Sequence, residues 1–232
     1  MARASLGMAA RDGIVYTWYA NGVDTFMYRQ NAETLTGLES TPWLDSTANV
    51  LLRWVDPGVS FNSHMAIGKD KIGIISQDGT NGIRLRIITR STGVVSSTTV
   101  ISATTTLHVC DICADDSDNF YVVWATSTTA FNRLQKFNSS GTSQWTATGS
   151  TRIYGCAYDR IRSKLQICGQ ALNGGANTVA DIDPSDGSYD DGSNVSSANW
   201  FSIRADGRMG WLIAKADTVA RITGDGEYTV TW

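Results

Sequence analysis

The feature that most constrains the fold of this 232-residue chain is a degenerate internal repeat. Five segments each place a small or polar turn before an apolar strand. The first apolar residues of these strands are Ile14, Ile72, Phe120, Leu165 and Met209. After a first interval of 58 residues, their spacings are 48, 45 and 44 residues. A period of this length is typical of architectures in which each unit buries its apolar faces against its neighbours.

A second marker keeps the same period. Each later segment contains a strand that runs into a glycine turn, at Gly93, Gly141, Gly187 and Gly226, and residues 25–30 occupy the matching place in the first unit. Short β-branched and aromatic runs separated by such turns predict four strands in each period. The chain has 22 Gly and only 3 Pro, which suits many tight turns between strands.

A four-stranded antiparallel unit of about 40 to 50 residues has the size of a β-propeller blade, and radial repetition protects strand edges. We therefore expect an all-β, five-bladed β-propeller that forms one domain over residues 1–232. The alternative architecture is a β-sandwich or jelly roll. The expected blades are residues 1–60, 61–106, 107–150, 151–198 and 199–232, with an insertion at about 35–60.

The first strand of each blade is expected to line a central channel. These inner strands are predicted near residues 6–10, 63–68, 109–114, 153–158 and 200–205. The chain starts on an inner strand and stops on an outer one, so the ring closes by packing alone or the chain is cut from something longer.

Charge and hydropathy remove several classes of partner. Lys and Arg number 19 against 22 Asp and Glu, and the sequence pI is about 5.3, which disfavours a nucleic-acid partner. The N-terminal residues contain no uninterrupted apolar run typical of a signal peptide, and no later run is long enough for a membrane span. Without an export signal, the four cysteines are expected to be reduced thiols.

Catalytic signals are weak. His64 and His108 are the only histidines, and no Gly-x-Ser-x-Gly motif is present. Both histidines fall near predicted inner strands of adjacent blades, so we retain them as candidate binding residues, although a structural role is commoner for a strand histidine. The expectation is a protein that is not an enzyme and carries no cofactor.

Metal ligation is also weakly indicated. Cys110 and Cys113 have the spacing of half a zinc site, but the second half is missing. In the acidic run from Asp181, the candidate calcium ligands are Asp181, Asp183 and Asp186, yet glycine stands at the seventh position where a calcium-binding EF-hand loop has it at the sixth. Turn-forming aspartates explain this run without an ion, so no metal is expected.

Tryptophan is abundant, with 8 residues in the chain. Trp18, Trp124 and Trp211 recur at equivalent places, which predicts packing between blades. Trp43 and Trp54 lie in the insertion and are candidate binding residues, because exposed aromatics stack on sugars or anchor protein partners.

The segment 133–145, Arg-Leu-Gln-Lys-Phe-Asn-Ser-Ser-Gly-Thr-Ser-Gln-Trp, follows 118–124, Asp-Asn-Phe-Tyr-Val-Val-Trp. Together they resemble the repeat of quinoprotein-like β-propellers, in which a strand, a glycine turn and a tryptophan recur. This resemblance implies a fold and not an activity.

The cysteine-poor chain, rich in Ser, Thr, Gly and Asn, also resembles bacteriophage virion proteins, including the propeller domains of tail nozzles and receptor-binding tips. That resemblance implies a non-enzymatic structural or binding component of a virion. Its implied partners are other virion proteins or a cell-surface receptor or glycan, with a homo-oligomer in the particle as one arrangement. A lectin-like carbohydrate-binding propeller is the alternative, and a glycosidase-type propeller enzyme is the second alternative.

Overall fold

The computed structural model describes thirteen stretches of the chain, and every regular element within them is a β-strand. These stretches are residues 4–21, 24–38, 41–45, 63–78, 82–102, 109–125, 133–147, 152–172, 177–193, 202–205, 210–215, 218–223 and 228–231. The predicted all-β class is confirmed. No helix long and apolar enough to cross a membrane occurs in these stretches.

The strands form five antiparallel sheets of four strands each, paired in chain order. The first contains β1 (Ala4–Arg11), β2 (Ile14–Asn21), β3 (Asp24–Asn31) and β4 (Leu44–Asp45). The second contains β5 (Ser63–Ile67), β6 (Lys71–Asp78), β7 (Gly82–Thr89) and β8 (Val95–Ser102). The third contains β9 (Val109–Ala114), β10 (Phe120–Trp124), β11 (Arg133–Phe137) and β12 (Ser143–Ala147).

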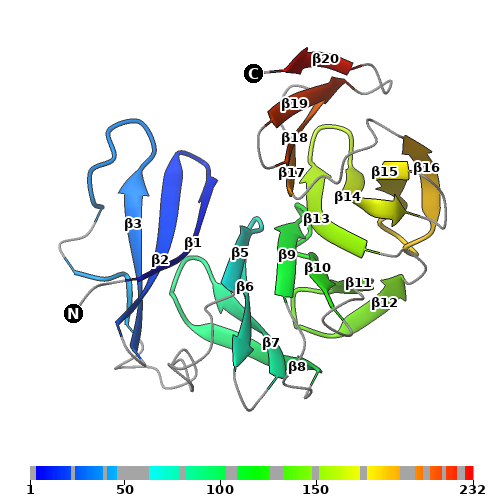
Figure 1. Cartoon of the computed structure of the whole chain (residues 1–232). Helices are drawn as coiled ribbons and strands as arrows, with labels where there is room; N and C mark the ends of the chain where they lie inside the picture. The colour runs from blue at the N-terminus through cyan, green and yellow to red at the C-terminus, as the bar shows by residue number, and fades with distance from the viewer. Residues whose placement is uncertain are drawn as a thin grey trace.

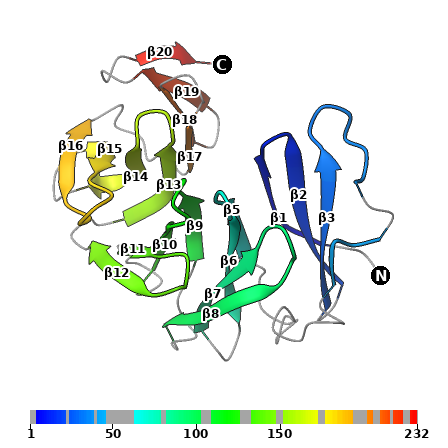
Figure 2. The ribbon, with the colours of Figure 1, turned by 180° about the vertical axis from the view of Figure 1, so that it is seen from behind.

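The fourth sheet contains β13 (Arg152–Asp159), β14 (Lys164–Leu172), β15 (Asn177–Ile182) and β16 (Tyr189–Ser193). The fifth contains β17 (Ser202–Ala205), β18 (Gly210–Lys215), β19 (Thr218–Thr223) and β20 (Tyr228–Thr231). The sheets stand side by side along an arc, with the first and fifth sheets at its two ends (Figures 1 and 2). This arrangement is propeller-like, and the predicted four-stranded antiparallel units are confirmed.

The first strand of every sheet lies on the inside of the arc. Each of these strands contacts the first strand of the next sheet, in the order β1, β5, β9, β13 and β17. Their positions confirm the inner strands predicted from the sequence, and β17 is described from Ser202 to Ala205.

Apolar clusters fill the spaces between adjacent sheets. Tyr16 and Trp18 of the first sheet pack with Ile72 and Ile74 of the second. Ile75, on the opposite face of β6, packs with Phe120 and Phe137 of the third sheet. Tyr121 and Leu134 of the third sheet pack with Leu165 and Ile167 of the fourth. A sheet covered on both faces needs nearly continuous apolar strands, which explains the run Ile72-Gly73-Ile74-Ile75.

The glycine turns found in the sequence are contact points between sheets. Gly93, Gly141 and Gly187 each have positive φ, at 72°, 81° and 81°, and lie between the third and fourth strands of their sheets. A Cβ atom at Gly93 would come 2.9 Å from Leu44, one at Gly141 would come 2.5 Å from Thr99, and one at Gly187 would come 2.6 Å from Trp145. Each neighbour is on the last strand of the preceding sheet, and we call these three contacts the rim joints.

The expected insertion at about 35–60 is described only in part. Trp43 and Leu44 lie beside the Gly93 turn, and Leu44 belongs to the two-residue strand β4. Trp54 lies outside the described residues, as do His108 and most of the insertion after Asp45.

Candidate functional site

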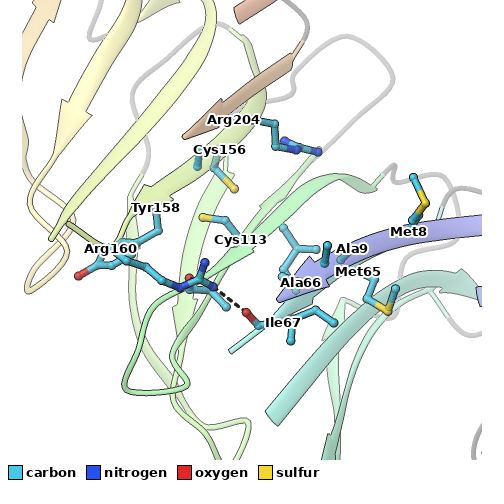
Figure 3. Close-up of a pocket in the computed structure, with 14 residues that line it drawn as sticks. Met8, Ala9, Met65, Ala66, Ile67, Cys113, Cys156, Tyr158, Arg160 and Arg204 are labelled. Atoms are coloured by element: carbon cyan, nitrogen blue, oxygen red, sulfur yellow. Dashed lines mark hydrogen bonds between the residues drawn. The ribbon is translucent and has the colours of Figure 1, made fainter. Parts of the chain in front are cut away.

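A cavity of about 330 Å³, which we call the axial cavity, lies along the inner strands and takes side chains from all five sheets. Its lining consists mainly of small apolar and sulfur-containing side chains, with an arginine toward each end (Figure 3). The lining residues labelled in the figure are Met8, Ala9, Met65, Ala66, Ile67, Cys113, Cys156, Tyr158, Arg160 and Arg204. The volume falls at the lower end of the range of small-molecule sites.

One end of the cavity carries an ion pair between the third and fifth sheets. Arg204 of β17 donates two hydrogen bonds to Asp111 of β9, at 2.6 and 3.1 Å. The Asp111 carboxylate is buried and also accepts the backbone N–H groups of Ile112 and Cys156, at 2.9 and 3.3 Å. Burial opposes the charged form of Arg204, but the Asp111 carboxylate outweighs it and raises the pKa of the guanidinium. Four inner-strand positions are thereby connected through one carboxylate.

His64 of β5 joins this group from the second sheet. Its Nδ1 atom lies 3.8 Å from the Asp111 carboxylate, and its side chain is about one-third exposed, at 36%. Burial lowers the pKa of the imidazole, the Asp111 carboxylate opposes this shift, and the Arg204 charge adds to it. We call Asp111, Arg204 and His64 the axial polar cluster.

The other end of the cavity carries a second set of charges. Asp116 accepts Arg11 of the first sheet at 2.8 Å and Arg160 of the fourth sheet at 2.9 Å. Arg160 also donates to the carbonyl oxygen atoms of Ile67 and Ala114, at 2.7 and 3.4 Å. Arginines therefore connect different sheets at both ends of the cavity.

Two thiols lie between these ends. Cys113 of β9 is partly buried and Cys156 of β13 is buried, and neither is in a disulfide. Their sulfur atoms point toward one another in Figure 3. The Cys156 thiol donates to the carbonyl oxygen of Tyr121 at 3.4 Å. Burial and the neighbouring Cys113 thiol raise the pKa of Cys156 well above its ordinary value.

A smaller pocket of about 190 Å³ lies on the first sheet. It is lined by Tyr19, Tyr28, Arg29, Gln30 and Gly37. The two tyrosine rings meet edge to face with their centres 5.9 Å apart. This pocket combines aromatic rings with amide and guanidinium groups.

The residues singled out in the sequence do not gather at one place. His64 lies at the cavity end, whereas Trp43 lies at the rim, where Arg29 covers its ring at 4.9 Å and Tyr16 meets it edge to face. Trp43 is thus a half-buried packing residue as well as a surface one. Trp18 and Trp124, two of the recurring tryptophans, pack in the clusters between sheets, as predicted, and Trp145 packs over Gly187.

The candidate calcium ligands serve other contacts. Asp181 accepts Gln166 at 2.5 Å and Lys164 at 3.4 Å. Asp183 and Asp186 accept the backbone N–H groups of Ser185 and Ser188 in the following turn, at 2.7 and 2.9 Å. Within the stretches that the structure describes, no three His, Cys, Asp or Glu side chains are grouped so that they could hold a metal ion.

Sequence reasoning missed most of the cavity. Asp111, Arg160, Arg204 and Cys156 were not selected because each is a single residue on a different strand, with no local motif. One signal was present for Asp111, because a charged residue inside the apolar strand Val109–Ala114 requires a partner. The partner itself lies 93 positions away in the chain.

No protein-family model and no curated protein matches this chain. Solved structures do match. A chain of a nidogen/laminin complex superposes with a TM-score of 0.63 at 12% identity, over 100% of this chain and 80% of that one. A chain of a mitotic checkpoint complex gives 0.65 at 11% identity, over 99% and 64%. Virginiamycin B lyase from Staphylococcus aureus gives 0.60 at 12% identity, over 97% and 68%.

These likenesses agree with the sheet arrangement and establish a β-propeller-like fold. At identities of 11 to 12% they carry no information about activity. In five of the structures that it matches, the chain spans between 61% and 81% of the matched chain.

Proposed function

We propose that this chain is a non-enzymatic interaction scaffold that serves as a structural or receptor-binding component of a bacteriophage virion. The observation that supports it is that the charged side chains at the two ends of the cavity are already ion-paired. Asp111 is ion-paired with Arg204 at one end of the cavity, and Asp116 is ion-paired with Arg160 at the other. These ion pairs hold the sheets together. Such an arrangement suits a rigid support that makes its contacts at its surface.

The glycosidase alternative receives less support. Hydrolysis of a glycoside generally requires two carboxylates that flank the bond, separated by about 5 to 9.5 Å. None of the residues found to line the axial cavity is an aspartate or glutamate. The nearby Asp111 is already bound by Arg204 and by two backbone N–H groups. Turnover of any member of a panel of chromogenic glycosides by the purified chain would overturn the non-enzymatic proposal.

The assignment to a virion rests on the sequence. A particle outside the cell benefits from an edge-protected β scaffold that does not require disulfides to fold. Mass spectrometry of purified particles from the phage that encodes this chain tests the assignment. We expect the chain in those particles, at a copy number that fits the tail symmetry. Its absence from particles, with the chain present in the infected cell, would contradict it.

A ring of five blades is part of this proposal, with one blade for each sheet. The first and fifth sheets stand at the two ends of the arc in Figure 1, so closure requires them to approach one another. Small-angle X-ray scattering distinguishes the two shapes, because a closed ring has a smaller radius of gyration than the arc. A scattering curve that fits the arc would contradict the closed ring and leave the scaffold proposal standing.

A carbohydrate-binding role is the second candidate, and the pocket on the first sheet favours it. Tyr19 and Tyr28 offer ring faces for stacking on a sugar, and Gln30 offers an amide for its hydroxyl groups. Glycan-array binding that is lost in Tyr19→Ala and kept in Leu35→Ala would support this role. Leu35 is a suitable control because it is 65% exposed on the same sheet's loop. Equal binding by both variants, or none by the wild type, would remove it.

A further inference from the structure

The two cavity thiols come from neighbouring sheets and face the same space. Cys113 lies on β9 and Cys156 on β13, which are adjacent inner strands. Both line the axial cavity, and the close-up shows their sulfur atoms directed toward each other (Figure 3). The neighbouring Cys113 thiol also contributes to the raised pKa of Cys156. A disulfide requires the two side chains to be directed toward one another, and these two thiols meet that requirement.

Cys168 is close in the chain but differently placed. In the sheet register it stands opposite Gly155, and its Sγ atom lies 3.2 Å from the position of a Cβ atom on that glycine. Successive residues of a strand point to opposite faces, so Cys168 and Cys156 lie on opposite faces of the fourth sheet. Cys168 is buried there and does not line the cavity. The pairing of Cys113 with Cys156 is therefore selective.

We propose that Cys113 and Cys156 form an intramolecular disulfide on exposure to a hydroperoxide, which makes the axial cavity a redox-sensitive bridge between the third and fourth sheets. This inference does not depend on the proposed function. It concerns the same cavity but requires neither a virion nor a receptor.

The reaction takes place in two steps. The Cys113 thiolate attacks hydrogen peroxide, the O–O bond breaks, and Cys113 becomes a sulfenic acid while hydroxide leaves and is protonated to water. The Cys156 sulfur then attacks the Cys113 sulfur, the S–O bond breaks, and the hydroxide that leaves takes the Cys156 proton to form a second water. Two thiols lose two electrons in total, and one peroxide is reduced to two waters.

Burial assigns the order of these steps. Cys113 is partly exposed to the cavity, so it meets the oxidant first. Cys156 is fully buried and its thiol is bound to the Tyr121 carbonyl, which keeps it protonated until the sulfenic acid forms beside it. A small peroxide fits a cavity of this size more readily than a large disulfide reagent does.

The test begins with fully reduced protein that is exposed to hydrogen peroxide, alkylated, and digested with trypsin and an enzyme that cleaves before aspartate. Cleavage before Asp111 separates Cys110 from Cys113, and cleavage after Arg152 and before Asp159 isolates Cys156. Under non-reducing conditions, mass spectrometry should show residues 111–114 joined to residues 153–158. Dithiothreitol should restore the two separate peptides.

Four serine variants make the assignment specific. The bridge should form in the wild type, Cys110→Ser and Cys168→Ser, and should be absent from Cys113→Ser and Cys156→Ser. Because the bridge joins residues 43 positions apart, oxidation should raise the Tm of the wild type and of Cys168→Ser by roughly 5 to 10 °C. Cys113→Ser, which alters a partly exposed side chain, should fold and show no such rise.

Several results would overturn the inference. These are two thiols that stay free after oxidation, a sulfinic acid at Cys113 without a bridge, and a bridge from Cys156 to Cys168. A bridge between two copies of the chain, seen as a dimer on a non-reducing gel, would overturn it as well. Should Cys156→Ser fail to fold, the comparison of Cys113→Ser with Cys168→Ser decides the question alone.

Discussion

The sheets are joined both at the rim and near the axis, and the two regions depend on the sequence in different ways. At the rim, three glycines of positive φ leave the same space, which is filled by Trp43 and Leu44 at Gly93, by Ser97 and Thr99 at Gly141, and by Trp145 at Gly187. Near the axis, one carboxylate, Asp111, receives donors from its own sheet and from two others. A rim joint thus needs a glycine and accepts many neighbours, whereas the axial polar cluster needs particular side chains.

The largest expected effect follows from removal of the axial carboxylate. Asp111→Ala leaves the Arg204 guanidinium and the N–H groups of Ile112 and Cys156 without their acceptor. Loss of one partner of a buried ion pair typically costs 3 to 5 kcal/mol, and we expect about 3 kcal/mol here because water reaches the half-exposed Arg204. Urea denaturation followed by circular dichroism measures the change in the free energy of unfolding.

Asp190→Ala is the matched control for this change. Asp190 is exposed, so its removal should alter the free energy of unfolding by no more than about 0.5 kcal/mol. If Asp111→Ala were as mild as Asp190→Ala, the axial polar cluster would contribute little to holding the sheets together.

The second prediction concerns the rim. Gly187→Ala should cost about 2 to 3 kcal/mol, because an alanine disfavours the φ of 81° and its Cβ atom would collide with the Trp145 ring. Gly13→Ala separates the two causes. Gly13 has a φ of 73° but no atom within 4 Å of the Cβ position, so this change should cost only about 1 kcal/mol.

The Trp145→Ala background sharpens the same comparison. There the collision partner is absent, so Gly187→Ala should cost no more than Gly13→Ala does, about 1 kcal/mol. An unchanged cost in that background would show that backbone strain, and not contact with the preceding sheet, restricts residue 187.

The polar rim joint should be weaker than the aromatic one. Thr99 donates a hydrogen bond of 2.8 Å to the carbonyl oxygen of Gly141, and Thr99→Val keeps the shape of the side chain without this bond. We expect a loss of about 1 kcal/mol, measured by the same urea titration. Thr98→Val, on the exposed face of β8, should change the free energy of unfolding by less than half as much. If Thr99→Val and Thr98→Val changed the free energy of unfolding equally, this hydrogen bond would not stabilise the joint.

The rim was visible in the sequence because it repeats. Gly93, Gly141 and Gly187 recur with the period of the repeat, and each position requires a backbone conformation that glycine adopts most easily. The inner strands were predictable for a similar reason, since every sheet begins with one. A conformational requirement that recurs in every unit places the same residue type at the same position of each repeat, and the sequence therefore shows it as a period.

The axial polar cluster produces no periodic pattern in the sequence. Asp111, His64 and Arg204 occupy non-equivalent places on β9, β5 and β17, and the contacts between them join different sheets. Each residue appears once, and its partner is chosen by the stacking of sheets and not by spacing along the chain. His64 was selected for its chemistry, but the acid and the arginine that set its surroundings required the structure.

The smallest expected effect concerns that histidine and the pH dependence of stability. Burial lowers the pKa of His64 in the folded chain below its ordinary value near 6.5, Asp111 partly offsets this shift, and Arg204 reinforces it. Between the folded and ordinary pKa values the unfolded chain binds more protons, so the stability that His64 contributes is present above about pH 6.5 and is lost as pH falls through the folded pKa. On going from about pH 7.5 to about pH 5.5, the Tm of the wild type should therefore fall by a few degrees more than that of His64→Gln. The difference stays small because the imidazole is 36% exposed and water stabilises part of its charge. Parallel Tm curves for the two proteins would show that the axis is held by Asp111 and Arg204 without a contribution from the protonation of His64.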